Sequence, residues 1–336
     1  RVPADRPRRR KVPGKRSTTG QRAEHRAGKS AEHPCRSKPP SHAGTISLPA
    51  AEPGVQRRGD IVQPLACIKL CGPPSIAAMR GSRPPLAPLR EDWDRALCVA
   101  AHPDDLEYGA ASAVARWTAQ GKRVSYLLLT TGEAGIDGVH PDKAGPLRAT
   151  EEREGAREVG VHDVEFLDYR DGVVEYGLPL RRDIARVIRR QRPDVVIGYA
   201  FTERLGGGVT NQADHRAAGL ATLDAARDAG NRWIFPELLT DEGLEPWPGV
   251  RFVCFAASPQ ATHGVDVTEF LPRGIASLRA HQAYLNGLGA GSFDPAEFLT
   301  TVARSHGSRL GVEFGVAFEV YELIPDSATL AQPDPT

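Results

Sequence analysis

The sequence lacks any apolar run long enough to cross a membrane. A transmembrane helix needs about 20 mainly apolar residues, and the most apolar early stretch, "PLACIKLCGPP", is short and is interrupted by Lys69. The basic run "RRRK" at residues 8–11 is not followed by the apolar segment that a secretory signal requires. We therefore expect a cytoplasmic protein that has no membrane as a partner.

Cysteine is also scarce, with five residues in 336. Cys67 and Cys71 lie close together, but no second pair follows that would complete a zinc ribbon. Such sparse use is typical of proteins in a reducing compartment, which again favours the cytoplasm.

A strong net charge is missing because a basic segment offsets an acidic one, giving +1 overall. Residues 1–80 hold 17 Lys/Arg and 5 Asp/Glu, whereas the remainder holds 26 basic and 37 acidic residues. The acidic remainder argues against a groove that binds nucleic acid specifically. The basic segment could contact polyanions nonspecifically, but a solvated tail is the expectation.

Methionine occurs once, as Met79. Residues 1–90 are rich in Arg, Pro, Gly and Ser and show no sustained apolar periodicity, which predicts a disordered tail. Because the patterned region begins shortly after Met79, we expect translation of the native protein to start near that residue. The pattern predicts one folded domain over residues 91–325 and a flexible C-terminal tail over residues 326–336.

Short apolar segments alternate with helical segments from about residue 92. Full apolar runs, rather than alternating polar and apolar residues, are typical of strands buried on both faces. The alternation predicts one Rossmann-like α/β domain with a mostly parallel sheet and helices on both faces. The expected strands lie at 96–101, 124–131, 164–169, 194–200, 250–257 and 315–323, and the expected helices at 106–121, 147–160, 178–192, 212–230 and 270–288.

The first predicted strand runs into "AHPDD" (101–105), which places an imidazole and two carboxylates within four positions. Open α/β sheets bind ligands outside the carboxyl ends of their strands. A dinucleotide-binding turn would carry G-x-G-x-x-G here, and that fingerprint is missing. Since Zn²⁺ takes His nitrogen and Asp oxygen, the turn favours a metal site with His102 and one aspartate as ligands. The alternative is a polar turn whose aspartate caps the following helix.

A third metal ligand would have to come from elsewhere, and His215 is the best-placed candidate. It lies in "NQADHRAAG", at the start of a predicted helix that follows the strand at 194–200. His215 therefore also belongs to the carboxyl edge of the sheet. Asp214 beside it is expected either to orient an imidazole or to serve as an acid at the helix N-terminus.

The order of motifs along the chain resembles the PIG-L/LmbE family of zinc-dependent N-deacetylases. The resemblance covers about residues 95–285 and implies a hydrolase that removes the acetyl group from an N-acetylglucosaminyl-type substrate, a small amino-sugar compound. Its motifs, besides "AHPDD", are "TTGEAG" (130–135), "FLDYRDG" (166–172), "RPDVVIGY" (192–199) and "ADHRAAG" (213–219).

The resemblance implies that His102, Asp105 and His215 bind the cofactor Zn²⁺. It implies that Asp104 is the general base, which accepts a proton from the water that attacks the amide carbonyl. In such a reaction the metal acidifies the water and stabilises the oxyanion.

Substrate contacts are implied for three further residues. Arg148 and Asp171 match family positions that contact the sugar, and Glu133 matches the acid of the second motif. Without the resemblance, Arg148 and Asp171 would be read as members of surface salt bridges.

The chain departs from the family pattern at Gln212, where many members carry a histidine that stabilises the oxyanion. An amide can donate a hydrogen bond but cannot supply a proton. Either Gln212 assists as a neutral donor or another group replaces the histidine, with His263 as first candidate and His281 as a weaker one. Two alternative functions stay open: an amidase of a mycothiol-like conjugate, and a sugar- or metal-binding module with impaired catalysis.

Overall fold

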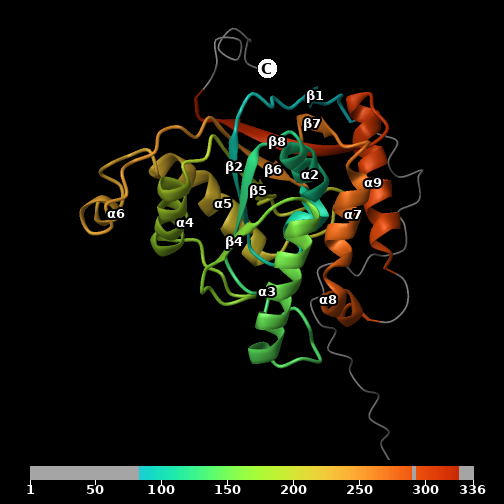
Figure 1. The fold of residues 1–336 in the computed structure, drawn as a ribbon, viewed down its shortest axis with the longest axis horizontal. Coiled ribbons are helices and arrows are strands. Elements are labelled where there is room, and N and C mark those ends of the chain that lie inside the picture. The colour runs from blue at the N-terminus through green and yellow to red at the C-terminus, as the bar shows by residue number, and fades with distance from the viewer. Residues whose placement is uncertain (1–82, 290–292, 325–336) are drawn as a thin grey trace, which may run out of the picture. The chain divides into compact units, whose positions relative to one another are not determined.

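One sheet of eight strands organises the part of the chain that the computed structural model describes, residues 83–289 and 293–324 (Figure 1). The strand order is β1-β7-β8-β6-β5-β2-β3-β4. The strands are β1 (Ala87–Pro88), β2 (Arg95–Ala100), β3 (Arg123–Leu128), β4 (Asp163–Phe166), β5 (Val195–Tyr199), β6 (Phe252–Ala256), β7 (His263–Asp266) and β8 (Gly315–Glu322). Among these eight described strands, only β8 runs antiparallel to its neighbours.

Nine helices are present in the described residues, and the larger ones cover both faces of this sheet. Figure 1 shows α4 and α5 on one side and α2, α3, α7 and α9 on the other. The predicted α/β class with a mostly parallel sheet is confirmed. The helices are α1 (Asp105–Gly109), α2 (Ala111–Ala119), α3 (Pro141–Glu158), α4 (Leu178–Gln191), α5 (Ala213–Asp228), α6 (Glu237–Thr240), α7 (Leu271–Arg279), α8 (Gln282–Gly287) and α9 (Pro295–Leu310).

Each face of the sheet has its own apolar core, because side chains of a strand point alternately to the two faces. Cys98 and Tyr126 pack with Trp117 of α2 on one face. Val196 packs with Ile184 of α4 on the other, together with α5. The central strands are therefore buried on both faces, which explains their continuous apolar sequences. Among the described residues, no helix has the length and apolar character needed to cross a bilayer.

The order in which the chain adds strands to the sheet reverses at β2. It places β3 and β4 on one side of β2 and returns to place β5 and β6 on the other. Such a reversal leaves a crevice outside the carboxyl ends of the two central strands. The residues that follow β2 and β5 therefore meet there, although they are far apart in sequence.

Helix boundaries differ from expectation where a local backbone turn interrupts a periodic pattern. The helix predicted at 106–121 breaks at Ala110, whose φ is −128°. The helix predicted at 270–288 is divided into α7 and α8 at His281, with ψ of 55°. Helix α9 was not predicted, although Asp294 and Pro295 form a standard helix start, in which the Asp294 side chain accepts from the amide of Ala296.

The segment before residue 91, expected to be tail, contributes to the fold from residue 83 onward. Leu86 and Leu89 are buried, and β1 pairs in parallel with β7. The short length of β1 explains why no strand pattern was visible there. The expected translation start at Met79, the remainder of the N-terminal tail and the C-terminal tail at 326–336 lie outside the described residues.

Helix α5 approaches β5 closely at Gly219. A Cβ atom placed there would lie 2.8 Å from the carbonyl oxygen of Tyr199 and 2.6 Å from the Cβ of Phe201. Real Cβ atoms do not come that near, so only glycine permits this spacing. Because α5 begins just before His215, the spacing also sets the position of that imidazole.

Gly219→Ala is expected to destabilise the fold by about 1–3 kcal/mol, since the added methyl group has to push α5 away from β5. This reverses the usual gain of about 1 kcal/mol from Gly to Ala inside a helix. Urea unfolding measures the free energy of unfolding. The exposed neighbour Leu220→Ala is the control and should change it by less than about 0.5 kcal/mol. A stabilised Gly219→Ala variant would contradict the close-contact argument.

Candidate metal centre

The turn after β2 is built around a residue in an unfavourable conformation. Asp104 has φ of 101° and ψ of −24°, a backbone conformation that residues other than glycine rarely adopt. Such a conformation costs on the order of 1–3 kcal/mol and needs support from its surroundings. The amide of Asp104 donates to Glu152 Oε2 at 3.2 Å. The amides of Ala101 and His102 both donate to Asp105 Oδ2 at 3.0 Å, which closes the turn around that carboxylate.

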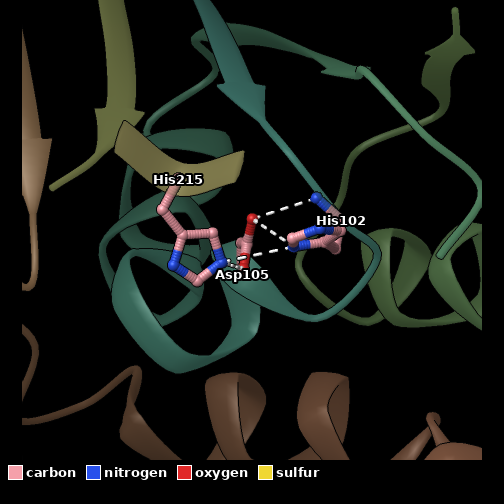
Figure 2. A group of neighbouring side chains, drawn as sticks. All are labelled: His102, Asp105 and His215. Atoms are coloured by element: carbon pink, nitrogen blue, oxygen red, sulfur yellow. Dashed lines mark hydrogen bonds and ion pairs between the residues drawn. The ribbon is translucent and has the colours of Figure 1, made fainter. Parts of the chain in front are cut away.

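Three buried side chains from this turn and from α5 point toward one another (Figure 2). His102 Nδ1 lies 3.2 Å from His215 Nε2. His215 Nε2 lies 2.8 Å from Asp105 Oδ1, and His102 Nδ1 lies 3.7 Å from Asp105 Oδ2. The structure thus brings together the three residues that the sequence proposed as metal ligands, from the carboxyl ends of β2 and β5.

Asn211 fixes which nitrogen of His215 faces this centre. Its Nδ2 group donates to the carbonyl oxygens of Ala200 and Thr202, so its Oδ1 atom is left as an acceptor. That oxygen lies 2.8 Å from His215 Nδ1. Nδ1 therefore carries the proton, and Nε2 presents a lone pair to the centre.

His102 is oriented in the same way by two carboxylates. Its Nε2 lies 3.0 Å from Asp171 Oδ1 and 3.3 Å from Asp214 Oδ2. Because both partners are acceptors, Nε2 carries a proton and can leave Nδ1 with a lone pair facing inward. Asp214 in turn accepts from the amides of Gly172 and Val174, which holds it in place. Of its two expected roles, Asp214 takes the one of orienting an imidazole.

The donor set requires a positive charge at its centre. Burial would lower the pKa of His102, but Asp105, Asp171 and Asp214 outweigh burial and raise it well above 6.5. Burial would raise the pKa of Asp105, but His215 and His102 hold it well below its usual range. Ligand atoms around tetrahedral zinc are about 3.3 Å apart, and the measured 2.8, 3.2 and 3.7 Å surround that value. A divalent cation therefore fits these residues.

Arg148, for which contact with the sugar stays a prediction, lies beneath the turn in the structure. It is 2% exposed. Its guanidinium donates to Asp104 Oδ1 at 2.8 Å and to the carbonyls of Gly132, at 2.9 Å, and Pro103. Burial raises the pKa of Asp104, and Arg148 acts in the opposite direction. Arg148 thus holds the predicted base and the turn together.

Asp171 and Glu133, also expected to bind substrate, lie in a chain of contacts behind His102. Besides its contact with His102, Asp171 accepts from the amide of Ala134 at 2.8 Å through Oδ2. Glu133 Oε1 accepts from the amide of Asp171 at 2.8 Å. Both carboxylates therefore orient an imidazole and its loop, and their contact with a substrate stays a prediction.

His263 does not reach the centre. It lies on β7, and β8, β6 and β5 lie between β7 and β2. The four spacings between these strands, of about 4.8 Å each, put β7 about 19 Å from β2. The expectation that His263 replaces the family histidine is therefore corrected. Gln212 is half-buried at the N-cap of α5, three residues before His215. His281 is fully buried beside Glu107 and Glu152.

Two residues of this centre, Asn211 and Glu152, were not predicted from the sequence. Asn211 precedes His215 by four residues, and that spacing at a helix start was an available signal. Glu152 lies on α3 four residues after Arg148, and only the packing of α3 beneath the turn reveals its bond to Asp104.

Asn211→Ala is expected to weaken metal binding by about 10–100-fold, because His215 loses the acceptor that fixes its tautomer. Competition with a chelator measures the affinity. Asn231→Ala, at an exposed asparagine outside this group of contacts, is the matched control. Unchanged affinity in Asn211→Ala would show that the ring is oriented by other means.

Comparison with known proteins identifies relatives of this chain. A family model described as PIG-L: GlcNAc-PI de-N-acetylase matches residues 97–226. A diacetylchitobiose deacetylase of Thermococcus kodakarensis is 29% identical over 235 residues, covering 68% of this chain and 84% of that protein. A 1D-myo-inositol 2-acetamido-2-deoxy-alpha-D-glucopyranoside deacetylase of Streptomyces scabiei is 33% identical over 180 residues, 44% of this chain and 56% of that protein.

The fold is shared with a solved structure as well. N,N'-diacetylchitobiose deacetylase from Pyrococcus horikoshii superposes with a TM-score of 0.62 at 24% identity, covering 70% of this chain and 89% of that chain. The family model spans β2 to α5, the segment that supplies all three converging side chains. The chain belongs to the PIG-L/LmbE family of N-deacetylases, hydrolases that act on amide bonds.

Proposed function

We propose that this chain is a zinc-dependent hydrolase that removes the acetyl group from an N-acetylglucosaminyl-type amino sugar. One observation carries the proposal: His102, Asp105 and His215 converge in a buried site directly beside Asp104. Relatives named for the deacetylation of diacetylchitobiose and of an inositol-linked acetamido sugar support the substrate class.

Two imidazoles and one carboxylate form a donor set of the kind found in catalytic zinc sites, where three protein ligands leave a position open. When bound there, the cation supplies Lewis-acid chemistry, which polarises the amide carbonyl and makes a water molecule more acidic. His102, Asp105 and His215 hold it, and Asn211 and Asp171 keep the two rings turned toward it.

Asp104 is the proposed general base. It accepts a proton from water as the water oxygen attacks the amide carbon, and the same proton is then available to the leaving nitrogen as the C–N bond breaks. Arg148 fixes the carboxylate, and Glu152 fixes the backbone of Asp104. Gln212, where many relatives carry histidine, contributes as a neutral donor.

A binding module without catalysis would need no base at the metal. Here the chain keeps Asp104 in a costly backbone conformation and commits a buried arginine to its carboxylate. These two features favour an enzyme over a module that only binds metal or sugar.

The proposal is tested by release of a free amine from a panel of compounds: N,N'-diacetylchitobiose, N-acetylglucosaminyl-inositol and a thiol conjugate of the mycothiol type. Acetate is the expected co-product from the first two compounds, and the thiol-bearing acid is the co-product from the conjugate. We expect release from at least one of the first two, loss on treatment with a chelator, and recovery on addition of Zn²⁺. Cleavage of the conjugate alone would favour the amidase. Zinc binding without turnover of any compound would favour the binding module.

Asp104→Asn should keep its metal and lose turnover by about 10²–10⁴-fold, because the amide cannot accept the proton. Metal content and kcat are measured on the same preparation. Asp142→Asn, at an exposed position near the start of α3, serves as control. Full activity in Asp104→Asn would remove this residue from the proposed mechanism.

A further inference from the structure

A second group of metal-ligating side chains lies beneath the turn that carries Asp104. Glu107 of α1, Glu152 of α3 and His281 between α7 and α8 are 2%, 0% and 0% exposed. One ligand atom from each lies within 4.8 Å of the other two. We propose that Glu107, Glu152 and His281 bind a second divalent cation, with a structural role, separate from the site at His102.

Buried polar atoms in this group have no hydrogen-bond partner among the described residues. They are Oε2 of Glu107, Oε1 of Glu152 and both ring nitrogens of His281. A buried polar group without a partner is costly, and most such groups in proteins are paired. Unpartnered atoms occur on all three side chains of one group, and therefore point to a ligand that the three side chains share.

The spacing suits a cation better than direct hydrogen bonds. His281 Nε2 lies 3.7 Å from Glu107 Oε2 and 3.8 Å from Glu152 Oε2. Both distances are too long for a hydrogen bond. They lie slightly above the separation of about 3.3–3.6 Å between nitrogen and oxygen ligands that bind one zinc ion tetrahedrally with bonds of about 2.0–2.2 Å.

Neighbouring groups hold the two carboxylates, as is usual for metal ligands. The hydroxyl of Ser277 lies 3.1 Å from Glu107 Oε1, and the amide of Asp104 donates to Glu152 Oε2. Gly155 keeps the space clear, since a Cβ atom there would come to 3.1 Å from His281 Nε2 and 3.3 Å from Glu107 Oε1.

Charge balance agrees with a dication. Burial and the neighbouring Glu107 raise the pKa of Glu152 well above its usual range, so ionisation of both glutamates needs a cation beside them. No lysine or arginine forms an ion pair with Glu107 or Glu152 in the part of the chain that the structure describes. When both glutamates are ionised beside an uncharged imidazole, the three side chains carry −2. A divalent cation would make this fully buried group neutral. A mixed set of one imidazole and two carboxylates suits Zn²⁺ or Mn²⁺.

Such a cation would join α1 and α3 to the bend between α7 and α8. Glu152 would then serve two groups at once, the cation and the amide of Asp104. The second site would thus support the unfavourable conformation of Asp104 from below, without contacting substrate.

The test counts metal ions on the full chain. The protein is stripped with a chelator, reloaded with Zn²⁺ alone, freed of excess by gel filtration and measured by mass spectrometry of the metal. We expect two zinc ions per chain in the wild type, and one in either His215→Ala or Glu152→Gln. The double variant should bind none. Glu154→Gln, at an exposed glutamate of the same helix, is the matched control and should keep two.

One zinc ion in the wild type and none in His215→Ala would overturn the proposal. Protons or water, and no cation, would then lie between Glu107, Glu152 and His281. If Glu152→Gln does not fold, the wild-type and His215→Ala counts still decide. Anomalous scattering from zinc in wild-type crystals must place the second ion at His281; any other position overturns the proposal. Deacetylase activity, assayed separately, is not a criterion, so failure here leaves the proposed function standing.

Discussion

Two imidazole nitrogens, Nδ1 of His102 and Nε2 of His215, face each other across 3.2 Å. Each ring has its other nitrogen committed to an acceptor, Asp171 and Asp214 for one and Asn211 for the other. Two lone pairs at that distance repel unless a proton or a cation lies between them. The neighbouring loops meet this constraint, since they carry Asn211 and Asp171, whose contacts keep the two rings in this orientation.

The constraint is met because β2 and β5 are neighbours in the sheet although their sequences are far apart. The two histidines are separated by 113 residues, and the chain builds β3 and β4 before it returns. Parallel pairing puts both carboxyl ends at one edge, so each strand delivers its histidine to the same crevice. Gly219 then lets α5 lie close enough to β5 for His215 to reach the other two ligands.

The sequence was sufficient for six of the eight described strands, the parallel sheet and the convergence of His102 with His215, because these depend on local pattern and on the rule that parallel strands end together. The choice of Asp105 as the aspartate that joins them came from the family resemblance. It was insufficient for side chains whose partners are set by helix packing. Arg148 shows this: its position along α3 was recognised, but which way it points depends on how α3 lies under the turn. His263 was misplaced because sequence motifs do not reveal how many strands separate β7 from β2.

The short strand β1 has a consequence for behaviour at high concentration. It is at one end of the described sheet, and its neighbouring amides, those of Ala87 and Leu89, both donate inward to the segment around β7. Pro88 between them has no N–H group, so that position offers no outward donor to another chain. Two copies therefore cannot extend the ladder at Pro88, and this edge is protected against the strand-to-strand aggregation that open sheets invite.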